Sequence, residues 1–134
     1  MAGARTAGGR AFARTVDMLR GDLAVTPAAD AAPAQGPPRA TTLTVVASNV
    51  ALTKTQLAKI AIVANTGAAR AINPYQTQSD GDQVLAFSTR ELNTAASMTA
   101  LGAVAAEVVS DAIVRAVRTA TGVPGWVAVR DLDR

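Results

Sequence analysis

Apolar and polar positions follow two patterns along the chain, short runs rich in β-branched residues and longer stripes with helical spacing. The run Thr41–Ala47 is rich in threonine and valine, and it lies between Pro-Pro and Ser-Asn. Such a run, bounded by turn residues, predicts a β-strand. Gln83–Thr89 has the same character and predicts a second strand.

A helical stripe follows the first predicted strand. Thr53 stands three residues before Gln56, which is the spacing of a capping box and marks a helix start. The apolar residues of this helix recur on one face, at Leu57, Ile60, Ala61, Ala64 and Ala68. We place Lys54 and Lys59 on its solvated side and its end before Pro74.

A longer stripe predicts a second helix over Ala95–Ala120, which ends before Gly122 and Pro124. Its apolar positions are Met98, Leu101, Ala105, Val108, Val109, Ala112, Ile113, Ala116 and Val117. Arg10–Leu23 is predicted as a short helix and Trp126–Val129 as a short edge strand. The main elements therefore follow the order strand-helix-strand-helix, and the fold class is α+β.

The chain changes character at Ala40. Ala24 to Arg39 contains several prolines among alanines, and proline neither fits a helix interior nor pairs inside a sheet, so this segment is predicted to be a linker. We divide the chain into residues 1–40, which end in this Pro/Ala-rich linker, and residues 41–134, a compact α/β segment. An exposed linker is a place where a chain can be cut without losing its fold.

Composition limits the chemistry. The chain has no cysteine and no histidine, which excludes thiol nucleophiles, histidine acid/base pairs and the usual zinc sites. The net charge of +3 is scattered and only 3% of residues are aromatic, so nucleic-acid binding is disfavoured. Neither an apolar run of bilayer length nor a secretory signal stands out, and we expect a cytoplasmic protein without a membrane contact.

Thr41 is the first candidate for catalysis. If the chain is cut before it, this threonine gains a free α-amine that can act as the base for its own hydroxyl. The steric preference of threonine for strands explains its presence equally well.

The acidic pair Asp80 and Asp82 is the second candidate. Asp-Gly-Asp is also typical of a turn, because glycine takes positive φ and aspartate bonds its own backbone. A calcium loop is excluded, since Val84 and Leu85 stand where an oxygen ligand and a glycine are required. We therefore predict neither a metal nor a cofactor.

Several short motifs stand between Thr41 and Thr89, and together they match a known family pattern without gaps. In chain order they are Thr41-Thr42-Leu43, Val45-Val46-Ala47, Ala51-Leu52-Thr53-Lys54, Gly67-Ala68-Ala69-Arg70-Ala71-Ile72, Asp80-Gly81-Asp82 and Ala86-Phe87-Ser88-Thr89. This pattern resembles the small subunit of the L-aminopeptidase/D-esterase family, over about residues 36 to 120. It is most similar to the threonine-type members, which include nylon-oligomer (6-aminohexanoate oligomer) hydrolases.

The resemblance implies a precursor that cuts itself before its nucleophile, and subunits that fold together as a four-layer αββα sandwich. Carried over by position, the cut lies between Ala40 and Thr41, Thr41 is the nucleophile, and Asp80 and Asp82 are the acidic pair beside it. Threonine-type members usually have asparagine where this chain has Ala40. The implied substrates are peptides, amides or esters.

The resemblance also implies a partner. The family's large subunit supplies further active-site groups, whereas only about 40 residues precede the expected cut. We therefore expect a large-subunit-like polypeptide as partner, with residues 1–40 corresponding to its end, and a homo- or hetero-oligomer. The chain is then a fragment, a separate subunit or a degenerate remnant. The alternative is a non-catalytic α/β association domain.

Overall fold

The structure is a computed structural model that describes residues 16–17, 20, 41–78, 80–124 and 127–132. Its main elements in chain order are β1 (Leu43–Val50), α2 (Lys54–Ala71), β2 (Gln83–Leu92) and α3 (Met98–Thr119). A short 3-10 helix, η2 (Val129–Asp131), follows them. The α+β class and the order strand-helix-strand-helix are confirmed.

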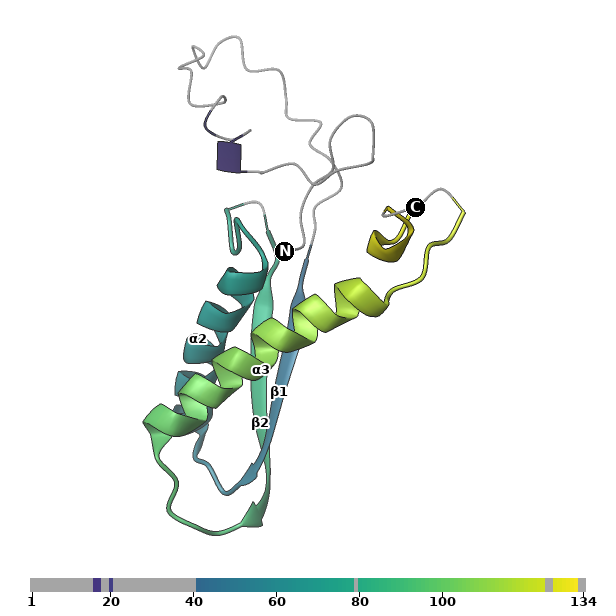
Figure 1. The fold of residues 1–134 in the computed structure, drawn as a ribbon. Coiled ribbons are helices and arrows are strands. Elements are labelled where there is room, and N and C mark those ends of the chain that lie inside the picture. Colours follow the sequence, from purple (N-terminus) through teal and green to yellow (C-terminus); the bar gives the residue numbers. More distant parts are fainter. Residues whose placement is uncertain (1–15, 18–19, 21–40, 79, 125–126, 133–134) are drawn as a thin grey trace.

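β1 and β2 pair in parallel, and α2 is the crossover between them (Figure 1). The register runs from Leu43 opposite Gln83 to Ser48 opposite Ser88, and it shifts before the last pair. Because the strands are parallel, both begin at the same end of the sheet. The residues just before β1 therefore lie beside those just before β2.

Within the described residues, helices cover one face of this sheet and leave the other face uncovered. The side chains toward α2 and α3 are half-buried, and they are Thr44, Val46, Val84 and Ala86. The alternate side chains are exposed, at Leu43 70%, Val45 60%, Leu85 55% and Phe87 48%. Both helices lie on the same side of the strands in Figure 1. The other side is an apolar face, formed by Leu43, Val45, Leu85 and Phe87, which we call the open sheet face.

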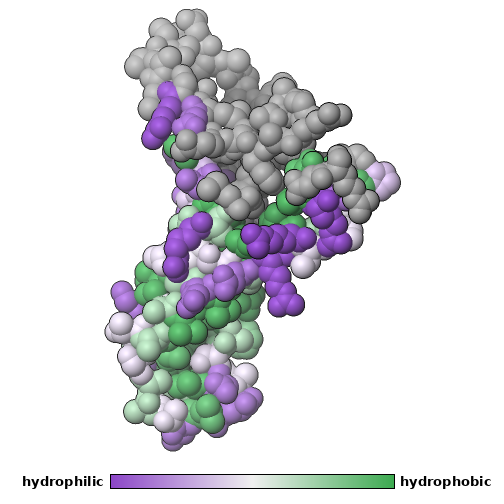
Figure 2. All heavy atoms as spheres, in the orientation of Figure 1, coloured by the Kyte–Doolittle hydropathy of each residue, from purple (hydrophilic) through white to green (hydrophobic). Residues whose placement is uncertain are grey.

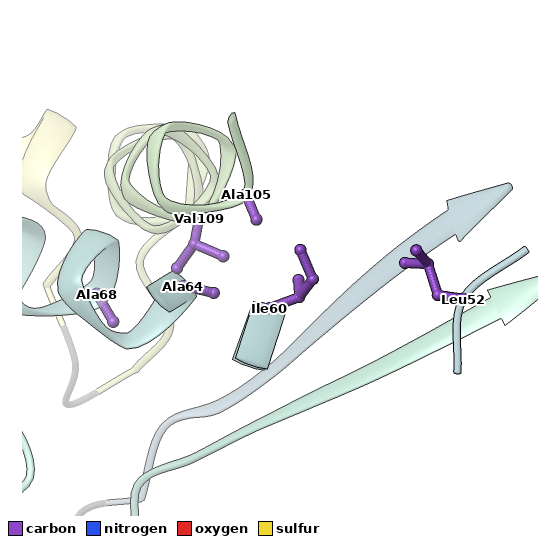
Figure 3. Close-up of a cluster of buried hydrophobic side chains, with 6 residues drawn as sticks. All are labelled: Leu52, Ile60, Ala64, Ala68, Ala105 and Val109. Carbon is purple, nitrogen blue, oxygen red and sulfur yellow. The ribbon is translucent and has the colours of Figure 1, made fainter. Parts of the chain in front are cut away.

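Small residues build the core between the two helices. Figure 3 shows Ile60, Ala64 and Ala68 of α2 facing Ala105 and Val109 of α3. The helices approach closely at Gly67 in α2, where an added Cβ atom would lie 1.8 Å from the Ala106 carbonyl oxygen. The abundance of alanine thus produces close helix packing.

Side-chain caps fix where the helices begin. The Gln56 N–H donates to Thr53 Oγ1 at 3.3 Å, and the Thr53 N–H donates to Gln56 Oε1 at 2.8 Å. The predicted capping box is therefore confirmed, with Lys54 and Lys59 both exposed. Ser97 caps α3 by accepting the Ala100 N–H, so this helix begins at Met98 and not at Ala95.

The predicted edge strand at Trp126–Val129 is wrong. The Ala128 N–H, which would pair in a strand, donates instead to Asp131 Oδ2 at 3.2 Å, and η2 begins at Val129. Trp126 itself lies outside the described residues. β2 is longer than predicted and continues to Leu92.

The predicted apolar stripe of α3 is only partly covered. Val109 is buried, but Val108 is 58% exposed, and Ala112 and Ala116 are also exposed. The reason is that α3 packs mainly on α2 and touches β1 much less. Figure 2 shows apolar surface on the side of the molecule that carries both helices.

Other predictions fall partly or wholly outside the described residues. Within the predicted helix Arg10–Leu23, Val16, Asp17 and Arg20 are helical, and the remaining residues are not described. The predicted linker and Ala40 also lie outside them. In the part of the chain that is described, no helix combines the length and the apolar character that a bilayer span requires.

Candidate active site

The heads of β1 and β2 bring the sequence-predicted residues together. The Gln83 N–H donates to the Thr42 carbonyl at 2.9 Å, which starts the strand pairing. Thr41 therefore lies beside the turn that precedes β2, although it precedes the first strand residue and is exposed. Thr41, Asp80 and Asp82, far apart in sequence, thus occupy one end of the sheet.

Asp82 holds two backbone segments. Its Oδ1 accepts the Thr42 N–H at 2.6 Å, and its Oδ2 accepts the Gln76 N–H at 3.1 Å. Gln76 has a φ of 54°, a conformation that is uncommon outside glycine. Asp82 therefore fixes the peptide that follows Thr41 and ties it to the loop after α2.

Asp80 is bound differently. Its Oδ2 accepts both the Thr77 N–H, at 2.9 Å, and the Thr77 hydroxyl, at 2.7 Å. The Asp80 N–H in turn donates to the Thr77 carbonyl at 3.0 Å. These bonds close a turn from Thr77 to Asp80, in which the aspartate side chain bonds nearby backbone as aspartates in turns do.

Gly81 does not have the role that a turn interpretation gives it. Its φ lies outside the range from +20° to +160°, so its conformation does not require glycine. Among the described non-glycine residues, the positive φ values belong to Gln76 and Arg90. What distinguishes Gly81 is its neighbour, because an added Cβ atom would lie 2.7 Å from Thr41 Oγ1.

Sequence reasoning missed Asn65 and Tyr75, which lie next to this site. The Tyr75 hydroxyl donates to Asn65 Oδ1 at 3.1 Å, and the Asn65 amide donates to the Ala61 carbonyl at 3.0 Å. Burial raises the pKa of Tyr75, and the negative charge of Asp82 raises it further. The available signal was Asn65 itself, the lone asparagine in the alanine-rich helix that follows Thr53.

This arrangement limits the chemistry at the site. It presents an exposed threonine hydroxyl, a clamped backbone and two carboxylates, with no imidazole or thiol. Carboxylates favour the charged form of a nearby ammonium group. Among the described residues, no group of three His, Cys, Asp or Glu side chains is arranged to hold a metal ion.

An apolar groove lies elsewhere on the molecule. It has a cavity volume of about 130 Å³, between β1 and α3. Its lining includes Val46, Leu52, Ile60, Leu101, Val104 and Val108. It contains none of the three candidate site residues.

Comparison with known proteins identifies the class of protein, because the chain matches a family of peptidases over residues 6–129. The chain belongs to peptidase family S58. This confirms the resemblance found in the sequence and extends it toward the N-terminus.

Individual relatives agree with this family. An uncharacterized aminopeptidase of Mycobacterium tuberculosis is 35% identical over 105 residues, which are 69% of this chain and 30% of the relative. A 6-aminohexanoate-oligomer endohydrolase of Kocuria is 30% identical over 89 residues, 58% of this chain and 25% of that protein. One from Paenarthrobacter ureafaciens is 31% identical over 87 residues, 57% of this chain and 24% of that protein. The chain thus spans less than a third of these relatives.

Proposed function

We propose that the chain is the nucleophile-bearing part of a self-processing hydrolase that cleaves amide or ester bonds with an N-terminal threonine. One observation carries this proposal. The parallel pairing of β1 and β2 puts the Thr41 hydroxyl against the Asp80–Asp82 turn, while Asp82 holds the Thr42 N–H. Membership of peptidase family S58 supports it, as do the names of the relatives.

The first step is self-cleavage. Thr41 Oγ1 attacks the Ala40 carbonyl, the peptide C–N bond breaks, and the new ester leaves Thr41 with a free α-amine. Water then hydrolyses the ester and releases the N-terminal piece. Asp82 contributes by holding the Thr42 amide at 2.6 Å, which keeps the attacking residue in place.

The second step is turnover. The α-amine of Thr41 takes the hydroxyl proton while the oxygen attacks the substrate carbonyl, and an acyl-enzyme forms. The amine passes this proton to the departing amine or alcohol as the acyl-enzyme forms, and water then hydrolyses the ester and frees the threonine hydroxyl. Asp80 and Asp82 supply negative charge near this amine or near an amino group of the substrate. Backbone N–H groups or an asparagine stabilise the oxyanion.

A partner completes the site in this proposal. A large-subunit-like polypeptide supplies the remaining groups and covers the open sheet face, which gives the four-layer αββα sandwich. The support is twofold: the chain spans 30% of its Mycobacterium tuberculosis relative, and the open sheet face is apolar. The assembled enzyme is then a homo- or hetero-oligomer.

Intact-mass measurement tests self-cleavage. We expect little or none in the isolated chain, because Ala40 replaces the usual asparagine and the partner's groups are missing. Co-expression with the large subunit of a family relative should release a piece that begins at Thr41. Thr41→Ala should abolish this piece and any hydrolysis of amino-acid amides. Thr42→Ala is the matched control, since it keeps the backbone N–H that bonds Asp82.

The competing function is a non-catalytic association domain or degenerate remnant. It is favoured by the open sheet face, which a binding domain also needs. Hydrolysis that persists unchanged in Thr41→Ala within the reconstituted complex would eliminate the threonine mechanism. The association domain would then be the better explanation.

A further inference from the structure

A glycine that the proposed reaction does not yet use, Gly81, lies against the Thr41 side chain. A Cβ atom built on Gly81 would lie 2.7 Å from Thr41 Oγ1, 3.4 Å from its Cγ2 and 3.6 Å from its Cβ. Cβ atoms essentially never approach another heavy atom closer than 3.0 Å. The Thr41 hydroxyl therefore occupies space that is free only because residue 81 has no side chain.

We propose that Gly81 is a positioning residue that keeps the space for the Thr41 hydroxyl. This inference rests on the proposed function for its catalytic meaning, but its geometric part stands without it. The backbone at Gly81 does not explain the glycine, since its φ lies outside the range from +20° to +160°. Any residue could adopt this backbone, so the requirement comes from the neighbouring side chain.

The backbone after Thr41 cannot easily move to relieve a clash. Asp82 accepts the Thr42 N–H at 2.6 Å, and the Thr42 carbonyl accepts the Gln83 N–H at 2.9 Å. Thr42 is thus held at both its N–H and its carbonyl group. A methyl group at position 81 must therefore be accommodated by rotation of the Thr41 side chain, which sends the hydroxyl to a different position.

The geometric part is tested on the full chain by methyl NMR with labelled threonine, which tolerates an oligomer. In the unmodified chain, the Thr41 methyl group should show a contact with the Gly81 α-protons. In Gly81→Ala, the χ1 coupling of Thr41 should change to that of another rotamer. Gly102→Ala is the matched control, because the nearest atoms to its new methyl group belong to the Val63 side chain, the first at 3.2 Å.

Two NMR results would overturn the inference. One is the absence of the contact between Thr41 and Gly81 in the unmodified chain, which needs no variant to fold. The other is an unchanged Thr41 rotamer in a folded Gly81→Ala chain. Neither depends on whether Thr41 performs any chemistry, so they separate this inference from the proposed function.

The catalytic part is tested in the complex with a family large subunit. Gly81→Ala should slow release of the piece that begins at Thr41 by at least about tenfold, because small displacements of reacting groups are costly. Adding Thr41→Ser to Gly81→Ala should leave the rate low, since serine keeps the hydroxyl oxygen that a Cβ atom at position 81 crowds at 2.7 Å. Equal rates for Gly81→Ala and the unmodified chain would overturn the catalytic role. If hydrolysis does not depend on Thr41 but the Thr41 rotamer shifts in Gly81→Ala, the proposed function is wrong. The geometric part of the inference then still stands.

Discussion

Asp80 and Asp82 are two positions apart and hold different parts of the chain. Asp80 bonds its own turn, through Thr77, whereas Asp82 joins the head of β1 to the loop after α2. The sequence motif predicted that both lie near Thr41. It could not predict this division, because the partner of each carboxylate depends on the path of the loop that contains Gln76.

Tyr75 provides a spectroscopic measure of this neighbourhood, since it is the only tyrosine in the chain. We expect its pKa to lie above the ordinary 10.0, first because of burial and then because of Asp82. Ultraviolet titration of the tyrosinate band measures it directly. Asp82→Asn should lower the pKa only partly, because burial remains. Asp111→Asn, on the exposed surface of α3, is the control.

Because the pKa of Tyr75 is raised in the folded chain, the stability of the fold should decrease at alkaline pH. The folded chain holds the Tyr75 proton more tightly than the unfolded chain does, so the stabilisation is fully present below pH 10.0. It is lost as pH rises through the higher folded pKa. Tyr75→Phe should remove this contribution to the pH dependence of denaturation. A tyrosine that titrates at its ordinary value in the folded chain contradicts the arrangement.

Among the elements, those with local signals were predicted best. The sequence contains the capping box of Thr53 and Gln56, and α2 begins where this motif indicates. The end of the chain was predicted wrongly, because the side chain of Asp131 takes the N–H that a strand would use. Helical spacing also could not show that Val108 remains exposed, since the crossing of α3 over its neighbours decides which part of a stripe is covered.

Gly67 tests the contact between the two helices. Gly67→Ala places a Cβ atom 1.8 Å from the Ala106 carbonyl oxygen, and backbone cannot yield as a side chain can. We expect a net loss of about 1–3 kcal/mol in the free energy of unfolding, measured by urea denaturation. This net loss already includes the gain of roughly 1 kcal/mol that alanine brings within a helix.

Gly102→Ala is the comparison for this prediction. Its Cβ atom would meet Val63 Cγ1 at 3.2 Å, a contact that a small side-chain shift relieves. Its unfolding free energy should therefore fall much less than that of Gly67→Ala. An equal or larger loss in Gly102→Ala would show that the helices do not cross at Gly67.

For the whole molecule, two strands and two helices leave much apolar surface uncovered. A two-stranded sheet is marginal alone, and the open sheet face exposes Leu43, Val45, Leu85 and Phe87. The family resemblance predicts a partner polypeptide for this chain, and this stays a prediction. The residues of the open sheet face could be identified only once the pairing register was known.

We expect the purified chain to be oligomeric or prone to aggregation, because exposed apolar patches drive association. Light scattering over a wide concentration range measures this. Val45→Thr together with Leu85→Thr should reduce association, since threonine is polar and still suits a strand. Ile62→Gln, at an exposed position of α2, is the control and should have a smaller effect. A stable monomer at all concentrations contradicts the prediction.

The parallel pairing of β1 and β2 also sets the order of events during folding. Helices such as α2 form from local contacts within about a microsecond, whereas a parallel pair must first close the long loop that contains the crossover. Until that loop closes, Thr41 has neither Gly81 nor Asp82 beside it. A chain emerging from the ribosome therefore carries this hydroxyl without the neighbours that it has in the folded structure. The chemistry proposed for Thr41 therefore cannot begin before the two strands have paired, which links its onset to completion of the fold.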